Sequence, residues 1–175
     1  MILVIIIEIV ALLMISWVVI GFFSTIFRGY APFVVSRKKI VDLVINVINP
    51  QPNQVVYELG SGSARFLQKV EKKFSNVKLI GFEYSFFIFL FSSLFFWLKH
   101  SRIKIYRKNI FDVNLKEADI IYGYLFPSMM SKLGKKIQTE CKPGTIFVSS
   151  MFSVPDWQPI KTLRQGGGTI YFYQV

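Results

Sequence analysis

Between Val55 and Ser150 the chain alternates between short apolar runs and helical patterns, and this alternation limits the possible folds more than any other feature. The apolar runs are continuous, which is typical of strands buried on both faces of a parallel sheet. Helices must then cover both faces of that sheet. We expect strands at residues 55–59, 78–83, 103–107, 118–125 and 145–150, with helices at 64–74, 86–98 and 128–139.

The segments that flank this region complete the predicted domain. Ser36 can cap a helix that starts at Arg37, and two prolines at positions 50 and 52 end that helix. At the other end, residues 160–164 and 169–175 lie on either side of three consecutive glycines and predict an antiparallel hairpin. The predicted fold is therefore α/β, with a mostly parallel sheet that ends in an antiparallel hairpin.

The N-terminal segment has a different character. Residues 1–27 are nearly all apolar, and Glu8 is their only charged residue. The uncharged run from Ile9 to Phe27 is long enough to cross a bilayer as a helix at about 1.5 Å per residue. A cleaved signal peptide would need a basic start and a small-x-small cleavage site, and neither is visible. A buried core helix is the other alternative, and it is unusual at this length. We therefore expect one transmembrane helix.

The charges around this segment predict its orientation. No Lys or Arg precedes the apolar run, and four bases follow it: Arg28, Arg37, Lys38 and Lys39. Because cytoplasmic flanks carry the excess of bases, the rest of the chain is expected to face the cytoplasm. The predicted division is a transmembrane anchor at residues 1–27, a linker at 28–36 and a domain at 37–175.

Composition narrows the classes of partner. Net charge is +11, which suits nucleic acid, an anionic membrane surface or acidic partners. The densest bases lie beside very apolar sequence, which favours a membrane, so no nucleic-acid partner is expected. The single cysteine, Cys141, excludes an internal disulfide and a cysteine-based zinc site. The single histidine, His100, lies among bases and is interpreted as a solvated surface residue, so no metal site is predicted.

The helix expected at residues 86–98 is apolar on all sides and too short to span a bilayer. A helix that flanks a sheet normally has one polar face, so the outer face of this helix must contact something apolar. The bases that could meet lipid headgroups beside it are Lys99, Arg102, Lys104, Arg107 and Lys108. Our hypothesis is that this helix rests on the membrane surface, and the alternatives are a deep core helix or a self-association face.

The chemistry of the domain centres on residues 58–65, which we call the glycine turn. An acid, Glu58, ends the first expected strand, and Gly60 and Gly62 follow it. The acid can accept hydrogen bonds from a ligand's ammonium or hydroxyl groups, while the glycines let the backbone approach the ligand closely. Ala64 and Arg65 come next, so the phosphate-binding lysine of a P-loop is missing.

Polar residues also end the next two expected strands. Glu83 lies at the end of the second strand, where a carboxylate can bind the two hydroxyls of a ribose. Asn109 follows the third strand, and its amide can pair with an adenine edge while Ile110 packs on the ring. The alternatives are a solvent-exposed strand-end acid and a turn-forming asparagine.

Together these features resemble the pocket of class I S-adenosylmethionine-dependent methyltransferases, a Rossmann-like fold that also ends with an antiparallel strand. Further blocks resemble the membrane-anchored family that includes the ATP synthase c-subunit lysine N-methyltransferase and its short prokaryotic relatives. Those blocks are residues 31–34, 57–62, 124–130, 142–144 and 152–159. The resemblance implies S-adenosyl-L-methionine as cofactor and a protein lysine, near the membrane, as methyl acceptor.

The resemblance also implies a role for each matched residue. The expected cofactor-binding residues are Pro32 and Phe33 as a lid, Glu58, Gly60, Ser61 and Gly62 at the methionine part, Glu83 at the ribose, and Asn109 with Ile110 at the adenine. Tyr124, Leu125 and Pro127 are expected to line the acceptor side, with Tyr124 and Pro127 as the catalytic candidates. Core packing is the alternative for Tyr124.

Two residues depart from the family pattern, in which Asp-Gly stands where this chain has Ser63 and Ala64. The change removes a carboxylate near the cofactor's amino group and adds a methyl where glycine allows close approach. The sequence therefore predicts a membrane-anchored methyltransferase, with a protein lysine as the expected acceptor. Two alternatives stay open: methylation of a lipid or small apolar molecule, and a membrane-tethered binding module with a degenerate cofactor pocket.

Overall fold

The computed structural model describes residues 2–27 and 38–175, and the chain separates into two compact units, Met1–Phe33 and Val34–Val175. The first unit contains helix α1 (Ile2–Phe27), whose described side chains, at residues 2, 4–10 and 12–16, are all exposed. Taken over the described residues, no helix qualifies by length and apolar character as a membrane span. The linker expected at residues 28–36 lies outside the described part of the chain, as do Ser36 and Arg37.

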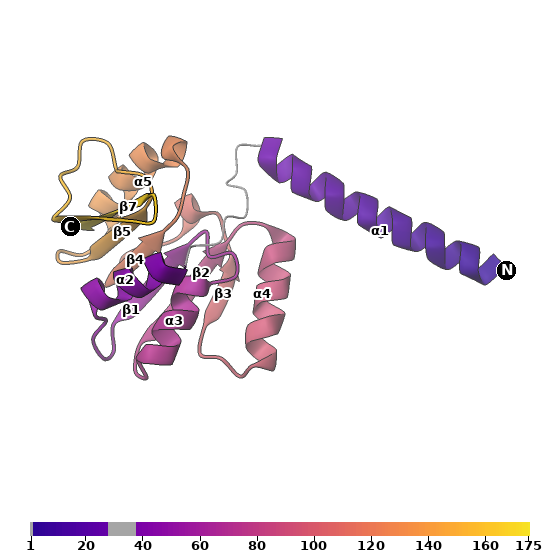
Figure 1. The fold of residues 1–175 in the computed structure, drawn as a ribbon, viewed down its shortest axis with the longest axis horizontal. Coiled ribbons are helices and arrows are strands. Elements are labelled where there is room, and N and C mark those ends of the chain that lie inside the picture. The colour runs from indigo at the N-terminus through magenta and orange to yellow at the C-terminus, as the bar shows by residue number, and fades with distance from the viewer. Residues whose placement is uncertain (1, 28–37) are drawn as a thin grey trace. The chain divides into compact units, whose positions relative to one another are not determined.

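The second unit is built on a mixed sheet with the strand order β3-β2-β1-β4-β5-β7-β6 (Figure 1). The strands are β1 (Val55–Leu59), β2 (Lys78–Glu83), β3 (Lys104–Arg107), β4 (Ile120–Gly123), β5 (Ile146–Ser150), β6 (Lys161–Gln165) and β7 (Gly168–Gln174). Strands β1 to β5 pair in parallel, whereas β7 runs antiparallel to both β5 and β6. This arrangement confirms the predicted mostly parallel sheet with a terminal hairpin.

Helices cover both faces of the sheet, as the continuous apolar strands require. They are α2 (Lys38–Ile48), α3 (Arg65–Lys73), α4 (Phe86–Leu98) and α5 (Pro127–Glu140), with a 3-10 turn η1 (Ile110–Asp112). One core cluster joins the sheet to α2, α3 and Phe96 of α4, and the other joins it to α5. Helix α2 ends two residues before Pro50, as expected from its two prolines.

The strand predicted at residues 118–125 is wrong at both ends, because β4 covers only Ile120–Gly123. The Asp119 side chain accepts a hydrogen bond from the Val55 N–H at 2.7 Å and pairs with Lys142 at 2.6 Å. After Gly123 the chain leaves the sheet toward α5. An apolar run does not reveal where a strand stops pairing, since residues beyond the ladder can be buried for other reasons.

The C-terminal hairpin turns on Gly166 and Gly167, which both have positive φ. Such values at two central residues are those of the turn that matches the twist of two antiparallel strands. Tyr173 of β7 is fully buried, and its hydroxyl accepts a hydrogen bond from the Val154 N–H at 2.9 Å. Trp157 contacts the same ring edge-on, so the block at residues 152–159 is fastened to β7.

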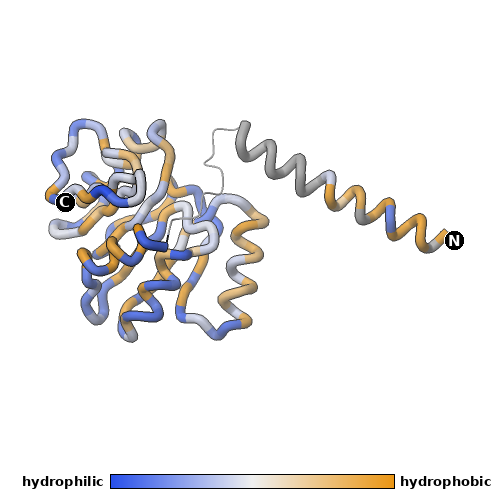
Figure 2. The backbone as a smooth tube through the Cα atoms, viewed as in Figure 1, coloured by the Kyte–Doolittle hydropathy of each residue, from blue (hydrophilic) through white to orange (hydrophobic). Residues whose placement is uncertain are grey.

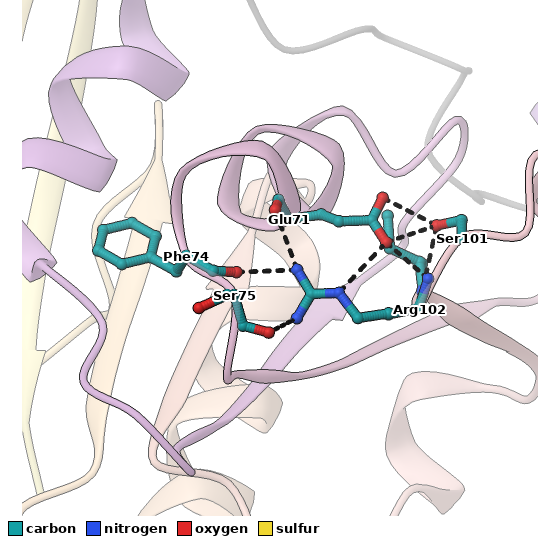
Figure 3. A network of polar contacts seen from close by, with 6 residues as sticks. Glu71, Phe74, Ser75, Ser101 and Arg102 are labelled. Atoms are coloured by element: carbon teal, nitrogen blue, oxygen red, sulfur yellow. Dashed lines mark hydrogen bonds and ion pairs between the residues drawn. The ribbon is translucent and has the colours of Figure 1, made fainter.

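Arg102 connects the end of α3 to the turn that follows α4 (Figure 3). Its guanidinium donates to the backbone carbonyls of Glu71, Phe74 and Ser75 and also pairs with the Glu71 carboxylate. The last carbonyls of a helix have no intrahelical partner, and a cation satisfies both their hydrogen bonds and the helix dipole. Arg102 therefore has a structural role, and its expected contact with lipid headgroups stays a prediction.

Candidate active site

The predicted site residues gather at the carboxyl ends of the central strands. β1 and β4 are neighbours at the centre of the sheet. The connection after β1 leads to β2 on one side, and the connection after β4 leads to β5 on the other side. Ligands of open α/β sheets bind outside the carboxyl ends of the strands at such a switch point. The structure places Glu58, the glycine turn, Glu83 and Tyr124 at this edge. Pro32 and Phe33 lie outside the described residues, so their lid role stays a prediction.

The glycine turn is a tight backbone loop held against β2. Gly60 and Gly62 have φ values of 67° and 54°, in the left-handed region that favours glycine. The N–H of Ser61 donates to the carbonyl of Phe82 at 3.0 Å, and the Ser61 side chain is buried beneath the turn. Gly60 is exposed, so its backbone is accessible to a ligand at the sheet edge. Side chains in place of these glycines would occupy the space next to the turn, so the glycine turn fits the predicted cofactor.

Glu83 joins the end of β2 to the glycine turn. One carboxylate oxygen accepts from the Gly62 N–H at 2.9 Å, and the other accepts from the Ser85 N–H at 2.8 Å. Burial raises the pKa of Glu83, although these hydrogen bonds oppose the shift. Each carboxylate oxygen has a second lone pair, so the group retains acceptors for a diol. These two hydrogen bonds exclude the alternative that Glu83 is a strand-end acid that only faces solvent.

Glu58 is buried, with 4% of its surface exposed, and its carboxyl lies against the first turn of α3. It accepts a hydrogen bond from the Leu67 N–H at 3.2 Å, one of the donors that a helix N-terminus leaves unpaired. Burial raises the pKa of Glu58 to about 8, outweighing this hydrogen bond. The acid of the glycine turn therefore anchors the following helix, and its contact with a ligand stays a prediction.

Ala64 directly precedes α3, and its backbone conformation is unusual for a residue with a side chain. Its φ of 50° and ψ of 43° are left-handed, which costs an L-residue roughly 1–2 kcal/mol. The family pattern has glycine here, the residue that adopts this conformation without that cost. The methyl group is fully buried in the core beside α3, so it does not project into the exposed edge of the turn. The substitution of glycine by Ala64 therefore strains the backbone, whereas the methyl group does not block the approach of a ligand.

Asn109 and Ile110 follow β3 and open the turn η1. The Asn109 side chain accepts a hydrogen bond from the Phe111 N–H at 3.1 Å, which is the turn-forming role considered as its alternative. Ile110 is buried in the core cluster that includes α5. Both residues follow Arg107, the partner of Glu83 in the sheet, and their adenine-binding roles stay predictions.

The chain beyond β4 forms the expected acceptor side. Tyr124 is half-buried, and Pro127 is exposed as the first residue of α5, where its fixed φ suits a helix start. Leu125 is buried between them and packs on the glycine turn: a Cβ added at Gly60 would lie 3.0 Å from its side chain. The structure thus brings Leu125 to the turn, while the catalytic roles of Tyr124 and Pro127 stay predictions.

Two residues that support the turn were missed by the sequence reasoning. A Cβ added at Gly81 of β2 would lie 2.8 Å from the Ser61 hydroxyl, so glycine leaves room for the turn. Ser92 of α4 donates to the carbonyl of Gly62 at 2.6 Å. The sequence contained a signal for each of them: Gly81 is an isolated glycine in a strand, and Ser92 is a polar residue in an apolar helix.

We expect Ser92→Ala to lower the free energy of unfolding by about 1–3 kcal/mol, because the Gly62 carbonyl would lose its buried donor. Ser93→Ala is the matched control. Its buried hydroxyl has no hydrogen-bond partner among the described residues, so its removal should change stability little or raise it. Denaturant unfolding of both variants measures the difference. Equal effects of the two substitutions would show that the Ser92 bond does not support the turn.

The fold is shared with known methyltransferases. An RNA methyltransferase from Salinibacter ruber, solved with S-adenosyl-L-homocysteine, superimposes with a TM-score of 0.75 at 24% identity. The match covers 81% of this chain and 93% of that one. A ribosomal protein L11 methylase from Lactobacillus delbrueckii superimposes with a TM-score of 0.63 at 16% identity, over 76% of this chain and 75% of that one. At these identities the likeness establishes the fold.

Sequence relatives come from distant organisms. A protein-lysine N-methyltransferase of Saccharolobus islandicus is 27% identical over 83% of this chain and 94% of its own length. The adenine nucleotide translocase lysine N-methyltransferase of Mus musculus is 26% identical, over 89% and 68% respectively. The ATP synthase c-subunit lysine N-methyltransferase of Xenopus laevis is 23% identical, over 82% and 63%.

The family assignment rests on the same residues as the site. The model of the ANTKMT methyltransferase domain matches residues 58–161, from the acid of the glycine turn to the start of the C-terminal hairpin. This range includes Glu83, the acceptor-side segment after β4 and the block fastened by Trp157. The chain belongs to the ANTKMT methyltransferase family, and it is an S-adenosylmethionine-dependent methyltransferase of class I fold.

Proposed function

We propose that this protein is a membrane-anchored protein-lysine N-methyltransferase whose catalytic domain faces the cytoplasm. The observation that carries the enzymatic part is the glycine turn joined to Glu83 through the Gly62 N–H at the carboxyl edge of the sheet. The acceptor is inferred from relatives in an archaeon, a mammal and an amphibian, because the name of each specifies a lysine.

In this proposal the chain mainly binds and orients. S-adenosylmethionine, when bound, supplies a methyl group that is already activated on a sulfonium, so in-line positioning accounts for much of the rate. The backbone at Gly60 and Gly62 holds the methionine part, and Glu83 accepts from the ribose hydroxyls. Leu125 packs over the turn, and the aromatic face of Tyr124 would favour the positively charged sulfonium of the cofactor.

A lysine acceptor must reach this site without its proton, since its ordinary pKa is about 10.4. An apolar environment lowers the pKa of an amine because it disfavours the charged form. The segment Tyr124–Pro127 has no charged side chain. We infer that it desolvates the incoming lysine, and that this effect replaces a dedicated general base.

The anchoring part of the proposal is supported by sequence and charge. The helix α1 has 26 residues, and Glu8 is the only charged residue in its sequence. Four bases follow this helix closely, which is the pattern of a cytoplasm-facing domain. A membrane-tethered enzyme would act on acceptors in or beside the same bilayer. The nearest alternative acceptor is therefore a lipid or another small apolar molecule.

The experiment that tests the proposal uses the full chain, methyl-labelled S-adenosylmethionine and membranes that lack the endogenous enzyme. Label is expected in protein, and hydrolysis should release it as methylated lysine. Label recovered in the lipid extract, or in RNA, would refute the lysine assignment while preserving the enzyme. Titration of S-adenosylhomocysteine in a calorimeter is the companion measurement. An absence of binding would favour a tethered module with a degenerate pocket.

A further inference from the structure

Helix α4 has the reverse of the polarity expected for a helix that covers a sheet. Its two polar residues face the protein: Ser92 is 8% exposed, and the Ser93 hydroxyl is buried. Its outer surface instead consists of large apolar side chains, with Phe91 at 69% exposed and Trp97 at 72%. The other exposed members are Phe86, Leu90, Leu94, Phe95 and Leu98. We call these seven side chains the α4 face.

The α4 face is more than scattered surface hydrophobicity. Single exposed apolar side chains are normal, whereas a contiguous group of large ones marks a site of contact with another apolar body. Figure 2 shows α4 as a largely hydrophobic helix followed directly by a hydrophilic segment. The helix is also firmly placed, because Phe96 is buried in the core and Ser92 is bonded to Gly62. The face is therefore a fixed surface of the folded domain.

The chain segment that contains the α4 face carries charges of one sign, and the acid that lies beside it from α3, Glu71, is paired with Arg102. No Asp or Glu occurs between Glu83 and Asp112. Besides Arg102, four exposed bases lie in the stretch after the helix and along the edge strand β3: Lys99, Lys104, Arg107 and Lys108. Two of these bases lie directly over rings of the face, Lys99 at 4.4 Å from the Phe95 centroid and Arg107 at 5.2 Å from the Phe86 centroid. We call these four bases the basic rim.

From the α4 face and the basic rim we propose that this side of the domain docks on an anionic bilayer surface, with the aromatic side chains at the level of the headgroups. A helix face of Phe, Leu and Trp with bases beside it is the combination that binds such interfaces. A second copy of the chain fits less well, because a symmetric pairing of two α4 faces would bring two basic rims together. Docking is a function separate from methyl transfer, and it places the glycine turn one hydrogen bond from the membrane-contacting helix.

The test measures lipid contact at a chosen residue of the full chain. Phe91→Cys provides a labelling site on the α4 face, and Lys135→Cys provides a matched exposed site on α5, which packs on the other face of the sheet. The native Cys141 is buried, which directs an environment-sensitive fluorophore to the introduced thiol. Each labelled protein is reconstituted in vesicles of phosphatidylcholine, with or without phosphatidylglycerol, that also contain brominated lipid.

We expect bromine to quench the label at position 91 at least about threefold more than the label at position 135, and more strongly with the anionic lipid. Replacing Lys99, Lys104 and Arg107 by alanine should weaken docking by about fivefold per cation. These variants should bind S-adenosylhomocysteine with unchanged affinity, so the docking and methyltransferase proposals fail separately. Equal quenching at the two positions would overturn the proposal. The proposal would also be overturned if the label at position 91 were shielded from water without lipid and two copies of the chain could be cross-linked.

Discussion

Glu83→Ala is expected to reduce the affinity for S-adenosylhomocysteine by about 100-fold, the largest effect of any single substitution in the proposed site. The change removes the carboxylate assigned to the ribose hydroxyls and also releases the Gly62 N–H and the Ser85 N–H. Hydrogen bonds to a charged group contribute about 1.5–3 kcal/mol each, and about 2.8 kcal/mol corresponds to 100-fold. Isothermal titration of the purified chain measures the change directly.

The support of the turn and the contact with the ribose can be separated. Glu83→Gln keeps the size of the side chain and one acceptor oxygen, so it should cost less affinity than alanine. A cofactor analogue without the ribose hydroxyls should bind wild type weakly and lose little further affinity in the Glu83→Gln variant. If the analogue instead loses as much affinity as the natural compound, Glu83 acts through the Gly62 bond alone. Unchanged affinity of Glu83→Ala would refute both roles.

Glu58 is expected to make the folded domain less stable as pH rises from about 5 to about 8. Burial raises the pKa of Glu58 from its ordinary value of 4.5 to about 8 in the folded chain. Between these values the folded state binds a proton that the unfolded state has released, so the free energy of unfolding falls with increasing pH. The slope contributed by one such group is about 1.4 kcal/mol per pH unit. The raised pKa of Glu83 acts in the same direction.

Glu58→Gln removes this titration and keeps an oxygen that can accept from the Leu67 N–H. The variant should therefore be less sensitive to pH than wild type and more stable than wild type near pH 8. Denaturant unfolding at several pH values gives both slopes. Glu58→Ala is the control for the loss of the helix contact, and it should lower stability by about 1–3 kcal/mol through the unpaired Leu67 N–H. Parallel pH profiles for wild type and Glu58→Gln would contradict the raised pKa.

Much of the fold could be predicted because it follows from local pattern. Continuous apolar strands require a sheet covered on both faces, and three glycines between two short runs require a tight reversal. The ends of the strands were harder to predict from the sequence, as the strand at Ile120–Gly123 demonstrates. Directly before this strand, the side chain of Asp119 bonds to Val55 and Lys142, which are distant in the sequence.

The candidate site likewise has a part that could be predicted from the sequence and a part that could not. Residue type and position relative to a strand end identified Glu58, Gly60, Gly62 and Glu83. Their actual partners were not predictable, since Glu58 contacts the start of α3 and Glu83 contacts the turn itself. The supporting residues Gly81 and Ser92 were missed because they act on the turn from other elements.

The sequence by itself determined the strand–helix alternation, the glycine turn and the apolar character of residues 86–98 on all sides, because these properties depend on residues that are neighbours in the chain. Only the tertiary structure decided which groups meet at the turn. The Gly62–Glu83 and Gly62–Ser92 bonds join residues 21 and 30 positions apart. Such pairings depend on the register of the sheet and the packing of α4, which buries the serine hydroxyls and Phe96 and leaves Phe86, Phe91 and Phe95 exposed.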